Sequence, residues 1–142
     1  MPKRRSDTPS SPTSADFAHL LAFRVSLRQF QHWSENQARG AGLTHVQHQL
    51  LVAIKGHAGD TPPSVGDLAG YLMLRHHSAV ELVDRAEAVG IVQRSPDPED
   101  ARVVRVQLTT RGDRLVTALT QAHLAELRKL AAVLNELAPV AD

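Results

Sequence analysis

Residues 82–112 decide the fold, and they read LVDRAEAVGIVQRSPDPEDARVVRVQLTTRG. The first part is a helix that ends before Gly90, a residue type suited to the left-handed backbone conformation after a helix. Residues 91–93 begin a strand, and residues 96–100 (PDPED) interrupt it as a loop. Residues 103–108 alternate apolar and polar side chains, as in a half-buried strand. The stretch therefore predicts a helix followed by a β-hairpin.

Two short helices precede the hairpin. Ser64 and Asp67 have the spacing of a capping box, which predicts a third helix over residues 64–72. A break over residues 73–75 separates it from the fourth helix. Two short helices joined by a tight turn are typical of a helix-turn-helix, and a hairpin directly after the second one is a wing. Residues 43–109 are therefore predicted to be a winged helix-turn-helix domain.

Longer helices flank this domain, which makes the chain mainly α-helical with one small hairpin. Ser14 is the expected N-cap of a helix within residues 14–42, and Thr110 that of a helix within residues 110–142. Both helices carry more apolar surface than a small winged domain covers, so we expect them to form the dimerisation region of a homodimer. Residues 1–13 are rich in Pro and Ser and are expected to be a disordered tail.

Composition limits the other possibilities. The 142 residues and 15.5 kDa fit one domain, with 42% apolar and 22% charged residues. The lack of cysteine excludes disulfides, thiolate metal sites and thiol catalysis. Catalytic and cofactor motifs are missing as well, so no enzyme activity and no cofactor are expected. Without a secretory signal or a membrane-spanning segment, we expect a cytoplasmic protein with no membrane partner.

Four segments in register carry a resemblance to a known family: residues 82–85, 90–92, 97–102 and 108–112. Over roughly residues 15–135 the chain resembles the MarR family of winged-helix bacterial transcription regulators. The resemblance implies a homodimer held by its terminal helices on a pseudo-palindromic double-stranded DNA operator. Its fourth helix would enter the major groove and its wing the minor groove. Repression of transcription, relieved by a small aromatic or anionic ligand, is also implied.

The start of the fourth helix holds the candidates for reading DNA bases. A helix fits the major groove, where residues near its N-terminus reach base edges. Arginine pairs with guanine, and histidines make such binding sensitive to pH. The alternative is a solvated polar helix start in which His76 or Ser78 is only a cap. The candidates are Arg75, His76, His77 and Ser78.

The hairpin and the third helix supply further candidates. Arg102 resembles the minor-groove arginine of the family, with Asp100 orienting it; the alternative is a surface salt bridge. Ser64 either binds a phosphate at the start of its helix or is a plain N-cap. Arg94 and Arg105 flank the hairpin and either contact phosphates or pair with acids of the wing.

A ligand pocket is predicted between the dimerisation helices and the winged domain. Phe30, Trp33, His45 and His48 would line it and suit a small aromatic ligand, the alternative being ordinary core packing. His45 and His48 are three residues apart and could share a helix face as metal ligands. No third ligand stands beside them in the sequence, so no metal site is predicted.

Three residues depart from the family pattern, and one of them is Ala101, which stands where the wing often has arginine. Glu81 stands where many members carry arginine, and Met73 where the turn often has glycine. An acid near DNA repels phosphate, and the net charge of the chain is only +1 with a pI of about 8.3. Glu81 and the low net charge motivate an alternative function, in which the chain is a winged-helix protein-interaction module without sequence-specific DNA binding.

Overall fold

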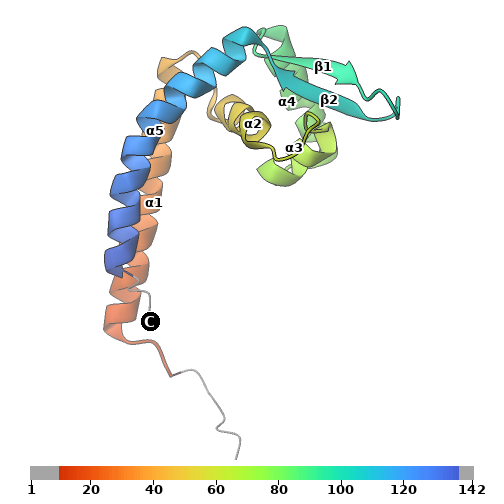
Figure 1. Ribbon diagram of the computed structural model, residues 1–142. Coiled ribbons are helices and arrows are strands. Elements are labelled where there is room, and N and C mark those ends of the chain that lie inside the picture. The colour runs from red at the N-terminus through yellow and green to blue at the C-terminus, as the bar shows by residue number, and fades with distance from the viewer. Residues whose placement is uncertain (1–9, 138–142) are drawn as a thin grey trace, which may run out of the picture.

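The computed structural model describes residues 10–137 and contains two parts, a winged domain and a long helical arm (Figure 1). The disordered tail expected over residues 1–13 falls mainly outside the described residues. The elements in chain order are α1 (Ser14–Gly40), α2 (His45–Gly56), α3 (Val65–Leu72), α4 (His76–Ala88), β1 (Val92–Pro96), β2 (Val104–Leu108) and α5 (Thr110–Leu137). The predicted fold class, mainly helical with one antiparallel hairpin, is confirmed.

The N-cap of α1 is Thr13, and the prediction of Ser14 is wrong by one residue. The Thr13 hydroxyl accepts a hydrogen bond from the backbone N–H of Asp16 at 3.2 Å. The Asp16 carboxylate accepts one in return from the N–H of Thr13 at 2.8 Å. Only Thr13 has an acid three positions later, and this reciprocal box determines where the helix begins.

The N-cap of α5 also lies one residue before the predicted one. Thr109, not Thr110, places its hydroxyl over the first turn, where it accepts from the N–H of Gly112 at 3.1 Å. The same hydroxyl donates to the carbonyl of Gly90 at 2.7 Å. This second bond ties the start of α5 to the end of α4, and that long-range contact selects Thr109.

The hairpin is a two-stranded antiparallel sheet in which Val92 pairs with Leu108 and Pro96 with Val104. Pro96 is therefore the last residue of β1 and not the first of the loop. A proline is tolerated at the end of an edge strand because no ladder hydrogen bond is needed there. The loop is closed by the N–H of Asp97, which donates to the carbonyl of Val103 at 2.9 Å.

The core lies between α2, α3, α4 and the hairpin. Burial of apolar side chains drives this packing, at about 25 cal/mol for each Å² removed from water. Residues of α5 and the end of α1 complete the core where the arm joins the domain. The largest fully buried side chains are Leu50, Leu51, Leu68, Val83, Ile91, Val92, Val106 and Val116.

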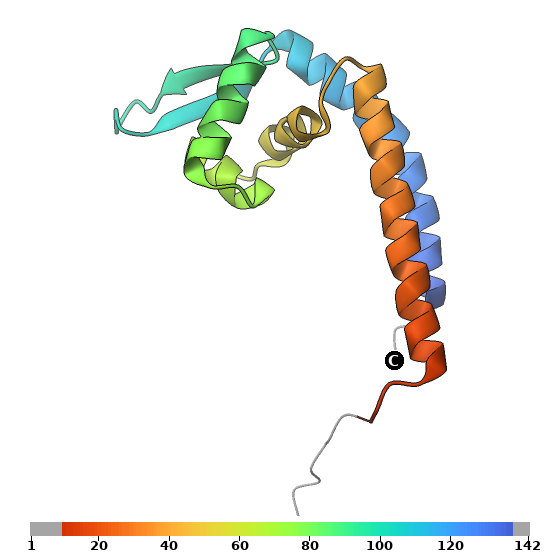
Figure 2. The same cartoon turned by 180° about the vertical axis from the view of Figure 1, so that it is seen from behind.

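The arm is formed by α1 and α5, which run side by side away from the winged domain in both views (Figures 1 and 2). Its outer part keeps the large apolar side chains of Phe17, Leu20 and Leu21 exposed, and Leu124 is exposed nearer the winged domain. No helix within residues 10–137 has the length and apolar character required to cross a bilayer.

Candidate DNA-binding surface

The start of α4 is open to solvent. Arg75 is the N-cap residue, and no side chain in the described part of the chain caps the helix. The alternative in which His76 or Ser78 is a cap is therefore wrong. Arg75, His76 and His77 are exposed and Ser78 is half-buried. The free backbone N–H groups of this first turn and the guanidinium of Arg75 favour an anion.

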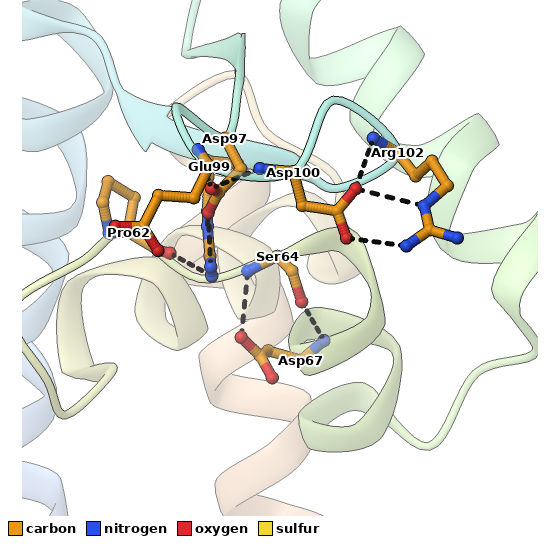
Figure 3. Close-up of polar contacts among 8 residues, drawn as sticks. Pro62, Ser64, Asp67, Asp97, Glu99, Asp100 and Arg102 are labelled. Carbon is orange, nitrogen blue, oxygen red and sulfur yellow. Dashed lines mark hydrogen bonds and ion pairs between the residues drawn. The ribbon is translucent and has the colours of Figure 1, made fainter.

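The wing carries an arginine that is exposed and also held in place (Figure 3). The Arg102 side chain is 90% exposed. Its Nε donates to Asp100 Oδ1 at 3.1 Å, its Nη2 to Oδ2 at 3.3 Å, and its backbone N–H to Oδ1 at 3.0 Å. These bonds lower the pKa of Asp100 below its usual value, chiefly through the Arg102 side chain. Asp100 thus fixes the direction of Arg102 without covering it.

Unlike Arg102, Arg105 is mostly buried and stabilises the wing. Its Nη2 lies 2.7 Å from Asp97 Oδ2, and both side chains are mostly buried. Its Nη1 donates to the carbonyl of Pro62 at 3.2 Å, which connects the wing to the loop before α3. The backbone N–H of Glu99, and then the side chain of Arg105, donate hydrogen bonds that lower the pKa of Asp97. Of the two roles considered for Arg105, the structure shows the ion pair with an acid of the wing.

Ser64 has the position of a helix cap. Its hydroxyl accepts from the N–H of Asp67 at 3.0 Å, and the Asp67 carboxylate accepts from the N–H of Ser64 at 3.0 Å (Figure 3). The predicted capping box is present. The Ser64 hydroxyl and the Asp67 carboxylate thus bond only to each other's backbone N–H groups. A phosphate contact by Ser64 stays a prediction.

Arg94 braces the hairpin against α4. Its Nη2 contacts the Asp84 carboxylate and donates to the carbonyl of Val80 at 3.2 Å, and its Nη1 lies 3.5 Å from Glu87 Oε1. Three acceptors hold this guanidinium, so its position is explained by structure alone. A phosphate contact by Arg94 stays a prediction.

The structure brings several of the predicted residues to one hollow between α3, α4 and the wing. This hollow has a volume of about 550 Å³. Asp100 and Arg105 lie beside it on the wing. The side chains that line it include Ser64, His76, Val80, Asp84, Arg94 and Arg102.

A larger cavity of about 590 Å³ lies between α1, α2 and the turn from α3 to α4. Phe30, His45 and His48, three of the four predicted pocket residues, line it. Trp33 does not, and this part of the prediction is wrong. The Trp33 ring instead meets the edge of the His123 ring, with centroids 4.7 Å apart, where α1 packs on α5.

Sequence reasoning missed several residues at this cavity, among them three with polar groups. Ser34 and Tyr71 line it, and His123 is buried directly behind Ser34. The signal for His123 was its place in the apolar stripe of α5, four residues from both Leu119 and Leu127. A histidine in such a stripe needs buried polar partners.

The polar atoms of this cavity are not all satisfied. Nδ1 of His45 and Nδ1 of His48 are buried and have no partner among the described residues. Burial, and then the nearby His123 and His45, lower the pKa of His48 to about 4. Its imidazole is therefore neutral at pH 7. Within residues 10–137, no three histidine or acidic side chains are grouped closely enough to hold a metal ion.

The fold is that of the winged helix-turn-helix regulators of transcription: a helix-turn-helix of α3 and α4, a wing and a helical arm. The chain belongs to the MarR family, whose model matches residues 41–103. It is 34% identical over 121 residues to the transcriptional activatory protein BadR of Rhodopseudomonas palustris, a match that covers 81% of this chain and 69% of BadR.

A second curated relative and a solved structure of the same fold were also found. The chain is 34% identical over 101 residues to the transcriptional repressor NicR of Pseudomonas putida, covering 71% of this chain and 61% of NicR. The crystal structure of Staphylococcus aureus MepR with DNA has the same fold, with a TM-score of 0.68, 22% identity, and coverage of 86% and 85% of the two chains. The chain spans 46–69% of the length of the curated relatives it matches.

Proposed function

We propose that this chain binds double-stranded DNA sequence-specifically as a homodimer and regulates transcription. The observation that carries the proposal is Arg102, which is 90% exposed and yet held at three points by Asp100. An exposed surface salt bridge contributes little to stability, about 0–1 kcal/mol. An arginine oriented in this way is instead suited to the negative potential of a narrow minor groove.

In the proposed complex, α4 enters the major groove and presents Arg75, His76, His77 and Ser78 to base edges. The wing follows the backbone, so that Arg102 reaches the adjacent minor groove. The hollow between α4 and the wing fits this arrangement because Arg102 of the wing and His76 at the start of α4 both line it. Ser64, Arg94 and Arg105 are proposed to contribute at most secondary phosphate contacts.

The winged domain is suited to DNA by the positions of its charged side chains and not by its net charge. Residues 43–109 contain six Lys and Arg against eight Asp and Glu. Five of those acids are engaged by backbone N–H groups or arginines, which reduces their repulsion of phosphate. The engaged acids are Asp67, Asp84, Glu87, Asp97 and Asp100.

The arm supports the homodimer. Phe17 and Leu21 are each 62% exposed on α1, and Leu124 is 48% exposed on α5. Phe17, Leu20 and Leu21 are three to four residues apart on α1 and form one exposed apolar stripe, and such patches mark interaction sites. A second copy of the arm would cover them, and the pair of winged domains would then contact two half-sites of a pseudo-palindromic operator.

We also propose that the chain represses transcription and that a small aromatic or anionic ligand relieves repression. The cavity of about 590 Å³ has the size of a small-molecule site. Phe30 offers an aromatic wall, and the unpartnered nitrogens of His45 and His48 offer hydrogen bonds. The turn from α3 to α4 forms another wall, so a ligand there would contact the segment that positions α4.

Retention of genomic DNA fragments on the full-length protein tests DNA binding. We expect enrichment of specific fragments, and a loss of about tenfold in affinity for Arg102→Ala. Arg128→Ala on the arm removes the same charge far from the wing and should leave binding unchanged. If nothing is retained even at low salt, the chain is a protein-interaction module instead. A reporter placed behind an enriched fragment gives the sign of regulation.

Thermal shift with a set of aromatic carboxylates and phenols tests the cavity. A ligand present at 100 times its Kd adds about 2.7 kcal/mol of stability. Val52→Trp should abolish the shift, since Val52 lines the cavity and is 46% exposed, so a larger side chain there fills the cavity without disturbing the core. No shift with any compound would assign the cavity to plain packing.

A further inference from the structure

The outer face of α4 carries one acidic side chain, Glu81, that makes no polar contact with the described residues. Of the three carboxylates on this helix, Asp84 and Glu87 both pair with Arg94. Glu81 is exposed and has no hydrogen-bond or ion-pair partner among residues 10–137. Folding therefore gives no reason for a charge at this position.

Glu81 lies on the side of α4 that points away from the core. It is two residues from the fully buried Val83, which places the two side chains on opposite faces of the helix. It is four residues after His77 and three after Ser78, so the three share one exposed face. In Figure 2, α4 lies at the front of the winged domain, and no other element passes in front of it.

A carboxylate on the face that enters the major groove has a specific chemical consequence. It is repelled by phosphates, and it is also repelled by the acceptor atoms O6 and N7 of guanine and O4 of thymine. The exocyclic N4 amino group of cytosine is a donor that it can accept from, whereas the N6 amino group of adenine lies beside the acceptor N7, which repels a carboxylate. The net effect is weaker binding to most sequences and a favourable contact with one base.

We propose that Glu81 is a specificity-determining residue that accepts a hydrogen bond from the N4 amino group of a cytosine in each half-site. The inference rests on the proposed function, because it needs α4 in the major groove. It assigns to this chain an operator with a C·G pair at the position that Glu81 faces. Glu81 thereby lowers affinity for other sequences and raises discrimination.

In vitro selection from randomised duplex DNA tests the proposal, using the full-length protein and the variants Glu81→Ala and Glu81→Gln. The wild type should select a symmetric motif with cytosine at one position of each half-site. Glu81→Ala should lose that single preference, with discrimination reduced about tenfold, and keep the others. Glu81→Gln should shift the same position toward adenine, because glutamine bonds to N6 and N7 of adenine.

Asp60→Asn is the matched control. Asp60 is also exposed, and it lies on the loop between α2 and α3, where it lines a separate hollow with Lys55 and Asp113. Asp60→Asn should leave the selected motif unchanged although, like Glu81→Ala, it removes one negative charge. If Glu81→Ala selects the wild-type motif with uniformly higher affinity, Glu81 only repels and the inference is overturned. If the wild type selects no motif, the proposed function itself fails.

Discussion

Ser34 on α1 and His123 on α5 share a buried hydrogen bond, with Oγ and Nε2 2.7 Å apart. The other ring nitrogen of His123, Nδ1, donates to the carbonyl of Leu119 at 2.7 Å. Both ring nitrogens are therefore satisfied, and in the neutral imidazole Nε2 accepts from the serine hydroxyl. This contact joins the two helices of the arm where they meet the winged domain. The His48 ring packs beside the His123 ring, with the two ring centroids 4.8 Å apart.

His48 makes the stability of the protein depend on pH. Its pKa in the folded state is about 4, below the value of 6.5 for a free histidine, chiefly because of burial. The unfolded chain binds the proton more tightly, so stability is full above pH 6.5 and is lost as the pH falls toward 4. We expect a loss of about 3 kcal/mol from this residue over that range.

Urea unfolding from pH 4 to 7.5, at one protein concentration, measures this effect. His48→Gln cannot titrate and should flatten the curve, whereas His32→Gln, at an exposed position of α1, should leave its slope intact. Equal slopes for the wild type and His48→Gln would show that His48 is protonated normally in the folded protein.

Met73 is strained where the turn of the helix-turn-helix reverses. It has φ 54° and ψ 40°, the left-handed region, and its side chain is 93% exposed. A residue with a Cβ atom loses about 1 kcal/mol in this conformation, and glycine adopts it freely. We expect Met73→Gly to raise the free energy of unfolding by about 0.5–1 kcal/mol despite the greater entropy of its unfolded state.

Met73→Ala separates the backbone effect from the loss of the side chain. It keeps the Cβ atom and the strain, so its stability should stay close to that of the wild type in the same urea titration. Equal stabilisation by alanine and glycine would place the cause in the exposed methionine side chain.

Leu21 tests the proposed dimer. It is 62% exposed on α1, so Leu21→Glu should leave the fold of one chain intact. Burying two such carboxylates in a dimer interface would be strongly unfavourable. Analytical ultracentrifugation should find a dimer for the wild type and a monomer at the same concentration for Leu21→Glu. Gln93→Glu adds a charge to the hairpin and should remain dimeric; a wild-type monomer would refute the dimer itself.

Local patterns predicted the helix-turn-helix and the wing well. The capping box of Ser64 and Asp67 and the glycine at position 90, with φ 78°, depend only on neighbouring residues. The pairing of Asp100 with Arg102 is equally local, since the two are two residues apart. Such contacts are visible in a sequence because no other part of the chain decides them.

Long-range contacts explain what the sequence did not show. Ser34 and His123 are 89 residues apart, and nothing local to either indicates the other. Packing of α5 on α1 turned Trp33 toward His123 and away from the cavity. Thr109 replaced Thr110 as the cap because its hydroxyl also donates to Gly90, 19 residues earlier.

Gly112 has a long-range reason too, and it gives a sharp prediction. A Cβ atom built on it would lie 2.0 Å from the carbonyl oxygen of Ile91, which also accepts the N–H of Thr109 at 3.2 Å. Gly112→Ala must push α5 away from the end of α4 and weaken that bond, at a cost of at least about 2 kcal/mol.

Gly70 provides the matched substitution, because it is also helical and a Cβ atom there meets nothing within 4 Å. Gly70→Ala should stabilise the protein by about 0.5–1 kcal/mol, since alanine is the better helix former. The two variants thus have effects of opposite sign in the same thermal or urea unfolding experiment. If Gly112→Ala were as stable as Gly70→Ala, α5 could not start as close to Ile91 as the structure places it.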